Sequence, residues 1–469
     1  MYRPSAQKSK KIQPHEAKVN QRNQSVELEQ INPNTAGIDL GAEEHWVCVP
    51  PQRDEVNVRR FGCFTPDLQA MAVWLKHCGI TSVAMEATGV YWIAVFQILE
   101  SEGFEVKLVN PRFVKTVPGR KTDVKDCQWL QQLHSYGLLS SSFRPEDQVC
   151  VLRSYIRHRE TLLQSRSTHL QRMQKALTQM NLQLHRVISD LSGVTGLAIV
   201  RAIVAGERDP HKLVALKHHL IRCSNEQLLA ALTGDYRAEH VFVLAQELSL
   251  YEVYLTQIAQ CDQQIKQCLT TFEDKSLDNP TLPPRPQGRR ASRHAPSFDL
   301  RGELYRISGV DFTSIDGLEA LTVQTILSEV GLDPNRFPSV KHFASWLGLC
   351  PGNQVSGGKV KSTRSRPVVN RAAHAFRLAA QSVGRSHTAL GAFYRRIQSR
   401  LGAPKAVTAT AHKLARMFYL LWTSGASYCD PGANYYEQRY QQRVLDNLKK
   451  KAAIFGFDLV AYSTVEEVS

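Results

Sequence analysis

Residues 35–40 (TAGIDL), 82–86 (SVAME) and 122–133 (TDVKDCQWLQQL) decide the fold of this chain. The first two stretches are short apolar runs that predict strands, one with Asp39 near its end and the other ending in Glu86. The third stretch predicts the start of a helix, because Thr and Asp are favoured at helix N-termini. Acidic side chains therefore recur where strands and helices begin or end.

The segments between these stretches complete a recognisable order of elements. Three strands in succession are followed by alternating helices and strands, which predicts a mixed sheet with helices packed on it, in the order of an RNase H-like domain. The predicted strands are Thr35–Leu40, His45–Pro50, Val56–Phe64, Ser82–Glu86 and Glu105–Val109, and the predicted helices are Pro66–His77 with Thr65 as its cap, Tyr91–Glu102 and a helix from Asp123.

Four carboxylates in this segment, those of Asp39, Glu86, Asp123 and Asp126, can gather at one end of such a sheet. Asp123 and Asp126 stand three residues apart and share one face of their helix. Taken singly, each acid has a structural interpretation as a strand end or a first-turn helix residue. Together they favour a site for Mg²⁺ or Mn²⁺, hard cations that take oxygen ligands and can clamp a phosphodiester.

The distribution of charge indicates a polyanionic partner. The 469 residues carry a formal net charge of +15, and residues 334–429 contain 15 Lys and Arg but no Asp or Glu. Outside this window the basic and acidic residues balance, so the whole excess lies in one C-terminal segment. A short basic run is usually a solvated face, but an acid-free window of this length favours nucleic-acid binding.

Cysteine spacing and hydropathy indicate the cellular compartment in which the protein works. The ten cysteines include no CxxC pair, which argues against a zinc site or a disulfide framework and favours a reducing compartment. No signal peptide is visible, and no apolar run approaches the ~18 residues of a membrane span. We expect a cytoplasmic protein with no membrane partner.

Two long seams of apolar residues occupy the middle of the chain. From 149 to about 188, apolar residues recur in alternating three- and four-residue steps that Arg159 and Arg166 interrupt. A second seam over 244–269 has Asp262 at a polar position. This pattern predicts long helices with coiled-coil packing. The seams can pair within one chain or between protomers, and we favour a dimer.

The last third predicts a helical domain with a helix-hairpin-helix-like element. Turns at Ser308-Gly309 and Asp316-Gly317 precede an amphipathic helix at Leu318–Val330, and turn amides of this kind can meet backbone phosphate. A later helix is predicted from about Pro367 to Val383. Aromatic and basic residues then alternate over 393–419, as in a groove for a nucleic-acid backbone.

A serine in this domain is a candidate nucleophile. Ser356 precedes two glycines in the predicted turn Val355–Lys359, and cations follow it. Glycines let a phosphate approach the backbone, and cations stabilise a pentacovalent phosphorane, although Ser-Gly-Gly alone is more often a plain turn. The residues predicted to bind nucleic acid are Lys359, Lys361, Arg364, Arg366, Arg371, Arg395, Arg396 and Lys413.

These features divide the chain into six segments. We expect a flexible basic arm at 1–33, an RNase H-like domain at 34–145, a coiled-coil helical domain at 146–272, a linker at 273–300, a C-terminal domain at 301–428 and a helical tail at 429–469.

Two separated blocks resemble one family. AGIDLGAEEHWVCV, MEATGVYW and NPRFVKTVPGRKTDVKDCQWL are similar to the N-terminal domain of the DEDD-type insertion-sequence transposases of family one-ten. GLEALTVQTILSEVGLDPNRFPSVKHFASWLGLCPGNQVSGGKV and NRAAHAFRLAA resemble the C-terminal domain of that family. Order and spacing agree, so the resemblance covers most of residues 35–425.

The resemblance implies a RuvC-like fold with a Mg²⁺-binding tetrad of Asp39, Glu86, Asp123 and Asp126. It implies that Ser356 forms a covalent phosphoserine link to DNA while donor and target strands are cut and rejoined. It also implies guidance by a structured bridge RNA and assembly as a tetramer, in which the serine and the acidic site come from different protomers.

Two other functions remain open on the sequence. One is a RuvC-like structure-specific nuclease in which water attacks and Ser356 is only a turn residue. The other is a non-catalytic nucleic-acid-binding assembly protein with a degenerate metal site. The presence of all four acids counts against the second.

Overall fold

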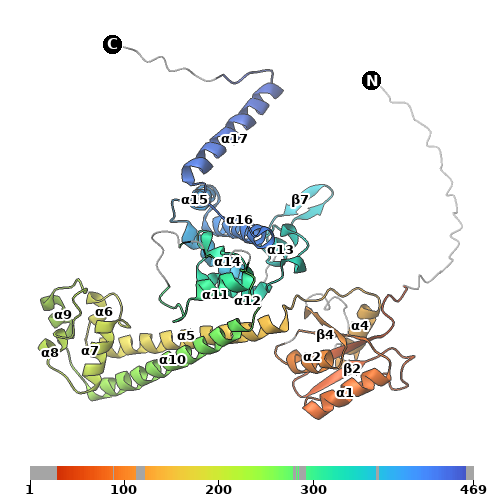
Figure 1. Cartoon of the computed structure of the whole chain (residues 1–469), viewed down its shortest axis with the longest axis horizontal. Helices are drawn as coiled ribbons and strands as arrows, with labels where there is room; N and C mark the ends of the chain where they lie inside the picture. Colours follow the sequence, from red (N-terminus) through yellow and green to blue (C-terminus); the bar gives the residue numbers. More distant parts are fainter. Residues whose placement is uncertain are drawn as a thin grey trace, which may run out of the picture. The chain divides into compact units, whose positions relative to one another are not determined.

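The computed structural model describes residues 29–87, 89–111, 122–277, 281–282, 284, 292–365 and 369–460. The chain forms two compact units, Met1–Arg144 and Pro145–Ser469, which we describe separately (Figure 1). Most of the predicted N-terminal arm and part of the predicted linker lie outside the described residues.

The first unit is built on a five-stranded mixed sheet. Its strands are β1 Thr35–Leu40, β2 Glu44–Cys48, β3 Val58–Gly62, β4 Ser82–Glu86 and β5 Glu105–Val109. They lie in the order β3-β2-β1-β4-β5, with β1, β2 and β3 antiparallel and β1, β4 and β5 parallel. This mixed sheet, flanked by helices, fits an RNase H-like fold, as predicted.

Helices cover both faces of the sheet. α1 (Thr65–His77) and α2 (Trp92–Ser101) pack on one face in a continuous apolar cluster, and α4 (Asp123–Ser135) packs on the other (Figure 1). The predicted cap of α1 is wrong. Thr65 is the first helical residue and Phe64 is the N-cap, because the Asp67 carboxylate accepts a hydrogen bond from the Phe64 amide at 3.3 Å.

The two seams of the second unit pack against each other within one chain. α5 (Asp147–Gln179) and α10 (Ala238–Thr270) are antiparallel, because Gln148 near the start of α5 bonds to Thr271 just after α10 at 2.8 Å. One polar position of each seam meets the other: Arg159 donates to the Asp262 carboxylate, and both side chains are buried.

The first long helix is shorter than predicted. α5 ends at Gln179, and Asn181 has a φ of 56°. Asn tolerates this left-handed conformation better than other residues with a Cβ, and it terminates helices for that reason. The apolar residues beyond it instead join a core made with four short helices, α6 Leu184–Val187, α7 Val194–Val204, α8 Pro210–Val214 and α9 Asn225–Leu232.

The rest of the second unit is a helical domain with one small hairpin. Its helices are α11 Leu300–Ser308, η1 Phe312–Ser314, α12 Ala320–Val330, η2 Pro334–Arg336, α13 Val340–Trp346, α14 Arg371–Val383, α15 Ala389–Leu401, α16 Ala403–Ser424 and α17 Ala433–Ile454. Its core is aromatic: Phe312 stacks on Phe418 with ring centroids 4.0 Å apart, and Phe376 lies edge-on to Phe418 at 5.6 Å.

Two predicted features of this domain change in the structure. α14 begins at Arg371 instead of about Pro367, because Asn370 caps it by accepting a hydrogen bond from the Ala373 amide. The glycine turns predicted to meet phosphate are packed internally: a Cβ at Gly317 would lie 2.8 Å from the Ala379 carbonyl of α14. The helix-hairpin-helix interpretation of these turns stays a prediction.

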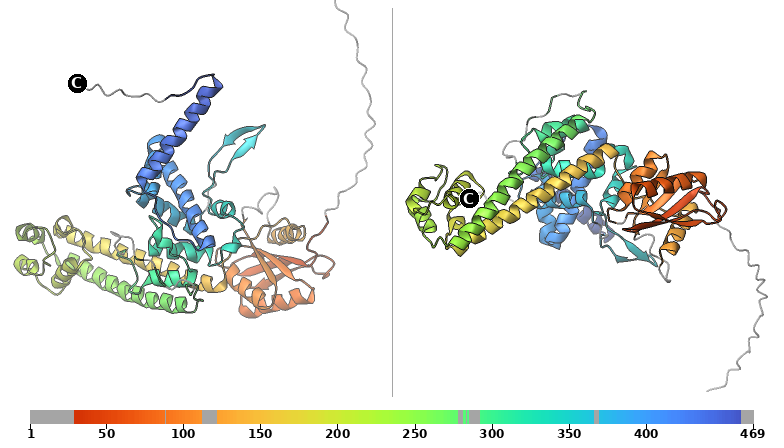
Figure 2. Two further views of the ribbon diagram at one scale, coloured as in Figure 1. Left: turned by 45° about the horizontal axis from the view of Figure 1, so that its top comes forward. Right: turned by 90° about the horizontal axis from the view of Figure 1, so that it is seen from below.

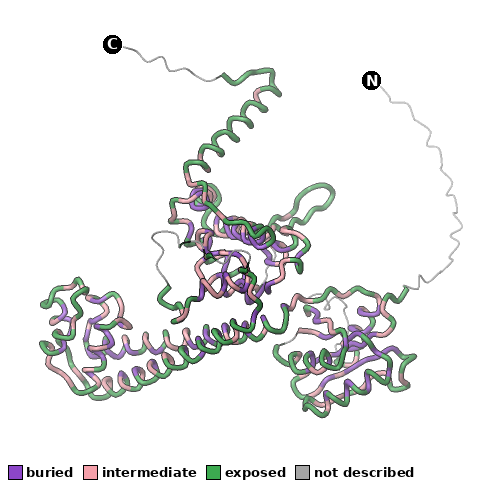
Figure 3. Tube along the Cα trace, in the orientation of Figure 1, coloured by how far each residue is buried: buried purple, intermediate pink, exposed green. Residues whose placement is uncertain are grey.

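The exposed parts of this domain are the hairpin and the last helix. β6 (Gln354–Ser356) and β7 (Lys359–Ser362) stand out from the helices around them (Figure 2). α17 buries none of its residues (Figure 3). Within the described part of the chain, no helix is both long enough and apolar enough to cross a bilayer.

Candidate functional site

Side-chain alternation along β1 and β4 places Asp39 and Glu86 on the face of the sheet that α4 covers. Ile38 and Met85 face the other way, into the apolar cluster with α1 and α2. Ala84 packs toward α4. Since Ile38 pairs with Met85 in parallel register, Asp39 and Glu86 come next along the two strands and lie side by side.

Contacts along α4 show in which direction the helix crosses the sheet. Its last turn lies at the N-terminal ends of the strands, where the Ser135 carbonyl accepts from the Asn32 amide at 2.9 Å. One residue earlier, His134 Nε2 lies 2.9 Å from Ser82 Oγ. The first turn of α4 therefore points to the C-terminal ends of β1 and β4, where the strand acids lie.

A glycine lets α4 lie directly on β1. A Cβ at Gly37 would lie 2.3 Å from the Gln131 amide nitrogen and 2.4 Å from the Cys127 carbonyl oxygen, so only glycine fits without displacing the helix. A hydrogen bond with Cys48, burial and then the negative charge of Asp39 raise the pKa of the Cys127 thiol. Because Gly37 and Asp39 lie on the same face of β1, the helix turn that carries Cys127 lies close to Asp39.

The first turn of α4 carries the remaining two acids. Thr122 caps the helix by accepting from the Lys125 amide, Asp123 is exposed and Asp126 is half-buried. All four candidate acids are thereby carried on three element ends at one edge of the sheet. In the described ranges, however, no group of three or more His, Cys, Asp or Glu side chains is close enough to hold a metal ion.

The donor chemistry of these acids fits a hard divalent cation, since all four offer carboxylate oxygens and none is a nitrogen or sulfur ligand. The neighbouring thiols of Cys48 and Cys127 are buried between β2 and α4 and belong to the packing of the sheet. Mg²⁺, when bound between such carboxylates, supplies charge stabilisation for a phosphodiester under attack.

Ser356 lies at the tip of the hairpin and is exposed. It pairs with Lys359 across a two-residue loop in which Gly357 and Gly358 have φ values of 57° and 74°. Two positive φ values in succession define a type I′ turn, which explains why the loop is made of glycines. A Cβ at either glycine would meet no described atom within 4 Å, so the surface beside the hydroxyl is open.

The cations that follow Ser356 lie along the same hairpin. Lys359 and Lys361 are exposed on β7, and Arg364 is exposed at the foot of the hairpin. Arg366 lies outside the described residues. The hairpin therefore presents a hydroxyl and at least three positive charges on one exposed element.

Other predicted basic residues have partners inside the second unit. Arg371 pairs with Glu160 of α5. Arg395 donates to the carbonyls of Gly384 and Ser386 at 3.1 and 2.7 Å, so it holds the end of α14. Because these side chains already have partners within the domain, they are weaker candidates for DNA contact than the hairpin lysines.

Arg396 and Lys413 lie where α17 joins α15 and α16. Arg396 pairs with Glu437 and lies over the Tyr440 ring at 3.4 Å. Lys413 lies over the Phe393 ring at 4.7 Å, and burial lowers its pKa. Of the two, Lys413 also lines an open groove, described below.

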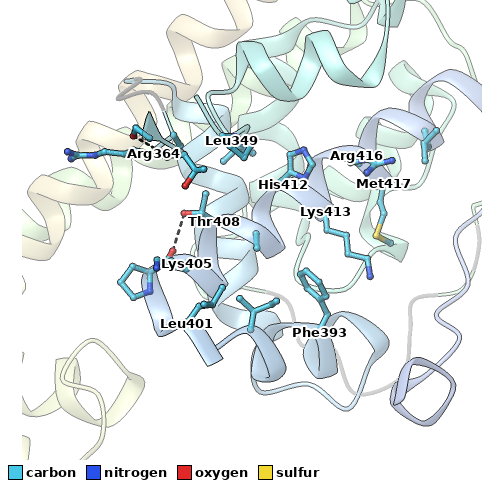
Figure 4. Close-up of a pocket in the computed structure, with 18 residues that line it drawn as sticks. Leu349, Arg364, Phe393, Leu401, Lys405, Thr408, His412, Lys413, Arg416 and Met417 are labelled. Carbon is cyan, nitrogen blue, oxygen red and sulfur yellow. Dashed lines mark hydrogen bonds between the residues drawn. The ribbon is translucent and has the colours of Figure 1, made fainter. Parts of the chain in front are cut away.

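The groove lies between the foot of the hairpin and helices α15 and α16, and its volume is about 1200 Å³ (Figure 4). Five of the alternating aromatic and basic residues predicted to form a nucleic-acid groove line it, whereas Tyr394 and Tyr419 are buried in the core. The five are Phe393, Lys405, His412, Lys413 and Arg416.

The fold defines the class of protein: a mixed α/β domain of the RNase H-like type, followed by a helical second unit. Comparison with known families makes this specific. The family model for DEDD transposases of the IS110 type matches residues 36–182. The family model for transposases of the IS116/IS110/IS902 family matches residues 311–395. The chain belongs to the IS110 family of transposases. No curated protein matches it.

Proposed function

We propose that this transposase cuts and rejoins DNA through a covalent bond between Ser356 Oγ and phosphorus, with Mg²⁺ held by Asp39, Glu86, Asp123 and Asp126. The observation that carries the proposal is the hairpin. It exposes a serine hydroxyl beside two glycines and opposite a lysine, in a family whose members move DNA.

The attack exchanges one phosphorus–oxygen bond for another. Ser356 Oγ loses its proton and bonds to phosphorus, while the bond from phosphorus to one bridging oxygen breaks. The freed strand end leaves as a hydroxyl after taking up a proton. A hydroxyl of the recipient strand reverses these steps, so no high-energy cofactor is needed.

Three features of the hairpin support attack at phosphorus. The open space beside Gly357 and Gly358 lets a phosphate reach the backbone. Lys359 and Lys361 supply positive charge that stabilises the negative charge of a phosphorane. Exposure of Ser356 allows a duplex to reach the hydroxyl without rearrangement of the core.

The acids would act on the same phosphodiester from the first unit. Four carboxylates drawn together around a phosphate would repel one another, and a bound cation would offset this repulsion. A structured guide RNA and assembly into dimers or tetramers belong to the proposal on the strength of the family resemblance. The exposed cations of the hairpin and the groove suit binding to RNA as well as to DNA.

The test is a denaturing gel of labelled donor DNA incubated with full-length protein, Mg²⁺ and RNA transcribed from the flanks of the element. We expect a protein–DNA adduct that is lost in Ser356→Ala and kept in Ser399→Ala, the control at an exposed serine of α15. Cut DNA without an adduct, unaffected by Ser356→Ala, would show that water attacks. If neither Ser356→Ala nor Asp39→Asn changes any DNA product, the protein is not acting as an enzyme through this site.

A further inference from the structure

The groove beside the hairpin has a composition that the strand-exchange chemistry does not explain. Its floor is apolar and formed by side chains of α15, α16 and the segment before the hairpin (Figure 4). Leu401 and Leu420 are 43% and 52% exposed, although side chains of this kind usually lie in the core. The apolar floor residues are Leu349, Phe393, Ile397, Leu401, Met417 and Leu420.

The rim of the groove is positively charged. Arg364, Lys405, Lys413 and Arg416 line it, together with the polar ring of His412, and no carboxylate is found among the described residues that do so. Two arginines of α17 add positive charge near the groove. Burial is the largest cause that lowers the pKa of Lys413, and the charges of Arg443 and Arg439 are the next largest. A groove with this surplus of cations fits an anionic occupant.

An apolar floor and a cationic rim together fit a chain of unpaired nucleotides. Unpaired bases have flat apolar faces that can pack on aromatic and aliphatic side chains, while their phosphates meet the cations. A duplex keeps its bases stacked inside and offers only phosphates and groove edges, so it would leave the floor in contact with water. The volume of about 1200 Å³ also exceeds the roughly 300–1,000 Å³ of small-molecule sites.

The groove shares residues with the stem of the serine hairpin. Ser362, Thr363, Arg364 and Ser365 line it, and the Arg364 carbonyl accepts from the Gly352 amide at 3.0 Å to close the stem. A strand bound in the groove therefore touches the element whose tip carries Ser356.

We propose that this groove binds unpaired single-stranded DNA next to the phosphate that Ser356 attacks, with bases on the Phe393–Leu420 floor and phosphates on the Lys405–Arg416 rim. This inference rests on the proposed function for its link to Ser356, but the binding itself requires no chemistry. The groove would hold a strand opened at the cut site and keep it away from its complement until the recipient strand arrives.

The test measures binding by fluorescence anisotropy with full-length protein in EDTA. The probes are a labelled single-stranded DNA of about 8 nucleotides, within the ~4–16 nucleotides of known single-strand sites, the same sequence as RNA, and the same DNA as duplex. Ala409→Trp fills the groove from its lining, and Leu420→Ser removes an exposed apolar side chain. We expect each to weaken single-strand DNA binding by about tenfold, which is ~1.4 kcal/mol, and to change duplex binding by less than about twofold.

Charge is tested with a matched pair of exposed lysines. Lys405→Gln removes a rim charge, and Lys341→Gln removes one from α13 outside the groove. We expect only the first to weaken single-strand binding. If Ala409→Trp lowers the melting temperature, its loss of binding could come from unfolding. Leu420→Ser then carries the test, because Leu420 is half-exposed and its replacement leaves the core intact.

Several results would overturn the inference. These are unchanged single-strand binding in Ala409→Trp and Leu420→Ser, equal losses for single strand and duplex, or tighter binding of the RNA probe than of the DNA probe. Ser356→Ala should bind the single strand normally. If the groove variants lose binding but no Ser356 adduct ever forms, the proposed chemistry fails alone. If the adduct forms and the groove variants bind normally, the groove assignment fails alone.

Discussion

At the scale of single residues, Gly37 determines how closely the acid-bearing helix approaches the acid-bearing strand. The absence of a side chain lets the backbone of α4 lie on β1 at the turn around Cys127. Sequence reasoning singled out Asp39, two residues later, and missed this glycine. A small residue two positions before an acid on a central strand is the signal that could have identified it, because both residues face the same side.

Replacing Gly37 by alanine should destabilise the first unit by about 1–3 kcal/mol, the usual cost of overpacking a close contact. The added Cβ would clash with backbone atoms of Gln131 and Cys127, which cannot rotate away. Urea unfolding measures the change in free energy. Val73→Ala, at a residue 67% exposed on α1, is the control and should change stability by less than about 0.5 kcal/mol. An equally small effect of Gly37→Ala would contradict the close packing.

His134 should make the stability of the first unit depend on pH. Burial, and then the charge of Lys107, lower its pKa from 6.5 to about 4. Between these values the unfolded chain binds the proton and the folded chain does not, so stability is full above pH 6.5 and falls as the pH drops toward 4. Urea unfolding midpoints over this range should fall less steeply in His134→Gln. Identical slopes in both proteins would show that His134 is not the group responsible.

At the scale of elements, the local sequence pattern predicted the strands of the sheet, whereas contacts with other residues set where some helices begin and end. The bounds of β1, β4 and β5 and the start of α4 agree with the prediction, because apolar runs and an acidic first turn are strong local signals. The end of α5 at Gln179 depends on one residue in a left-handed conformation. The cap of α1 depends on Asp67 reaching back to Phe64, which a search for Ser or Thr caps overlooks.

The sequence predicts those residues of the candidate site that stand in a recognisable local pattern. The acids at strand and helix ends, and the Ser-Gly-Gly turn, are readable in the sequence. The partners of Arg371 and Arg396 cannot be read in the sequence. Glu160, the partner of Arg371, lies 211 residues away, and the partner of Arg396 depends on where α17 folds back. A basic residue in an acid-free window can thus be structural when a distant acid reaches it.

Breaking the buried pair between α5 and α10 should be costly. Arg159→Met leaves the Asp262 carboxylate buried without its partner, which typically costs 3–5 kcal/mol, whereas the double change Arg159→Met with Asp262→Leu should recover most of that loss. Urea unfolding measures both. Arg201→Met, which breaks the exposed pair with Glu252, is the matched control and should cost less than about 1 kcal/mol. Equal costs for the two single changes would mean that the Arg159 pair is not buried in solution.

The acid-bearing edge of the first unit should bind a divalent cation before any DNA is present. Mg²⁺ or Mn²⁺ at 100 times its dissociation constant would add about 2.7 kcal/mol of stability. The midpoint of thermal unfolding should therefore rise with the cation in the wild type and stay unchanged in Asp39→Asn. Glu43→Gln, an exposed acid just after β1, should respond like the wild type. A shift of equal size in Asp39→Asn would place the cation elsewhere.

At the scale of the whole molecule, the proposed strand exchange draws on groups from both units. The first unit carries the acids and a near balance of charge. The second carries the hairpin, the groove and the acid-free window that holds the entire excess of +15. Some of that charge is used internally by Arg371, Arg395 and Arg396. Six other cations of this window lie on the hairpin or line the groove: Lys359, Lys361, Arg364, Lys405, Lys413 and Arg416.

The central claim is that the acids and the serine act on one phosphodiester, and peptide mapping of the adduct tests it most directly. After reaction with donor DNA, RNA and Mg²⁺, nuclease trimming and proteolysis, mass spectrometry should find a nucleotide bonded to Ser356 in the wild type. The same peptide should be unmodified in Asp39→Asn. A nucleotide on a different residue, or an adduct at Ser356 that forms equally well in Asp39→Asn, would contradict the account.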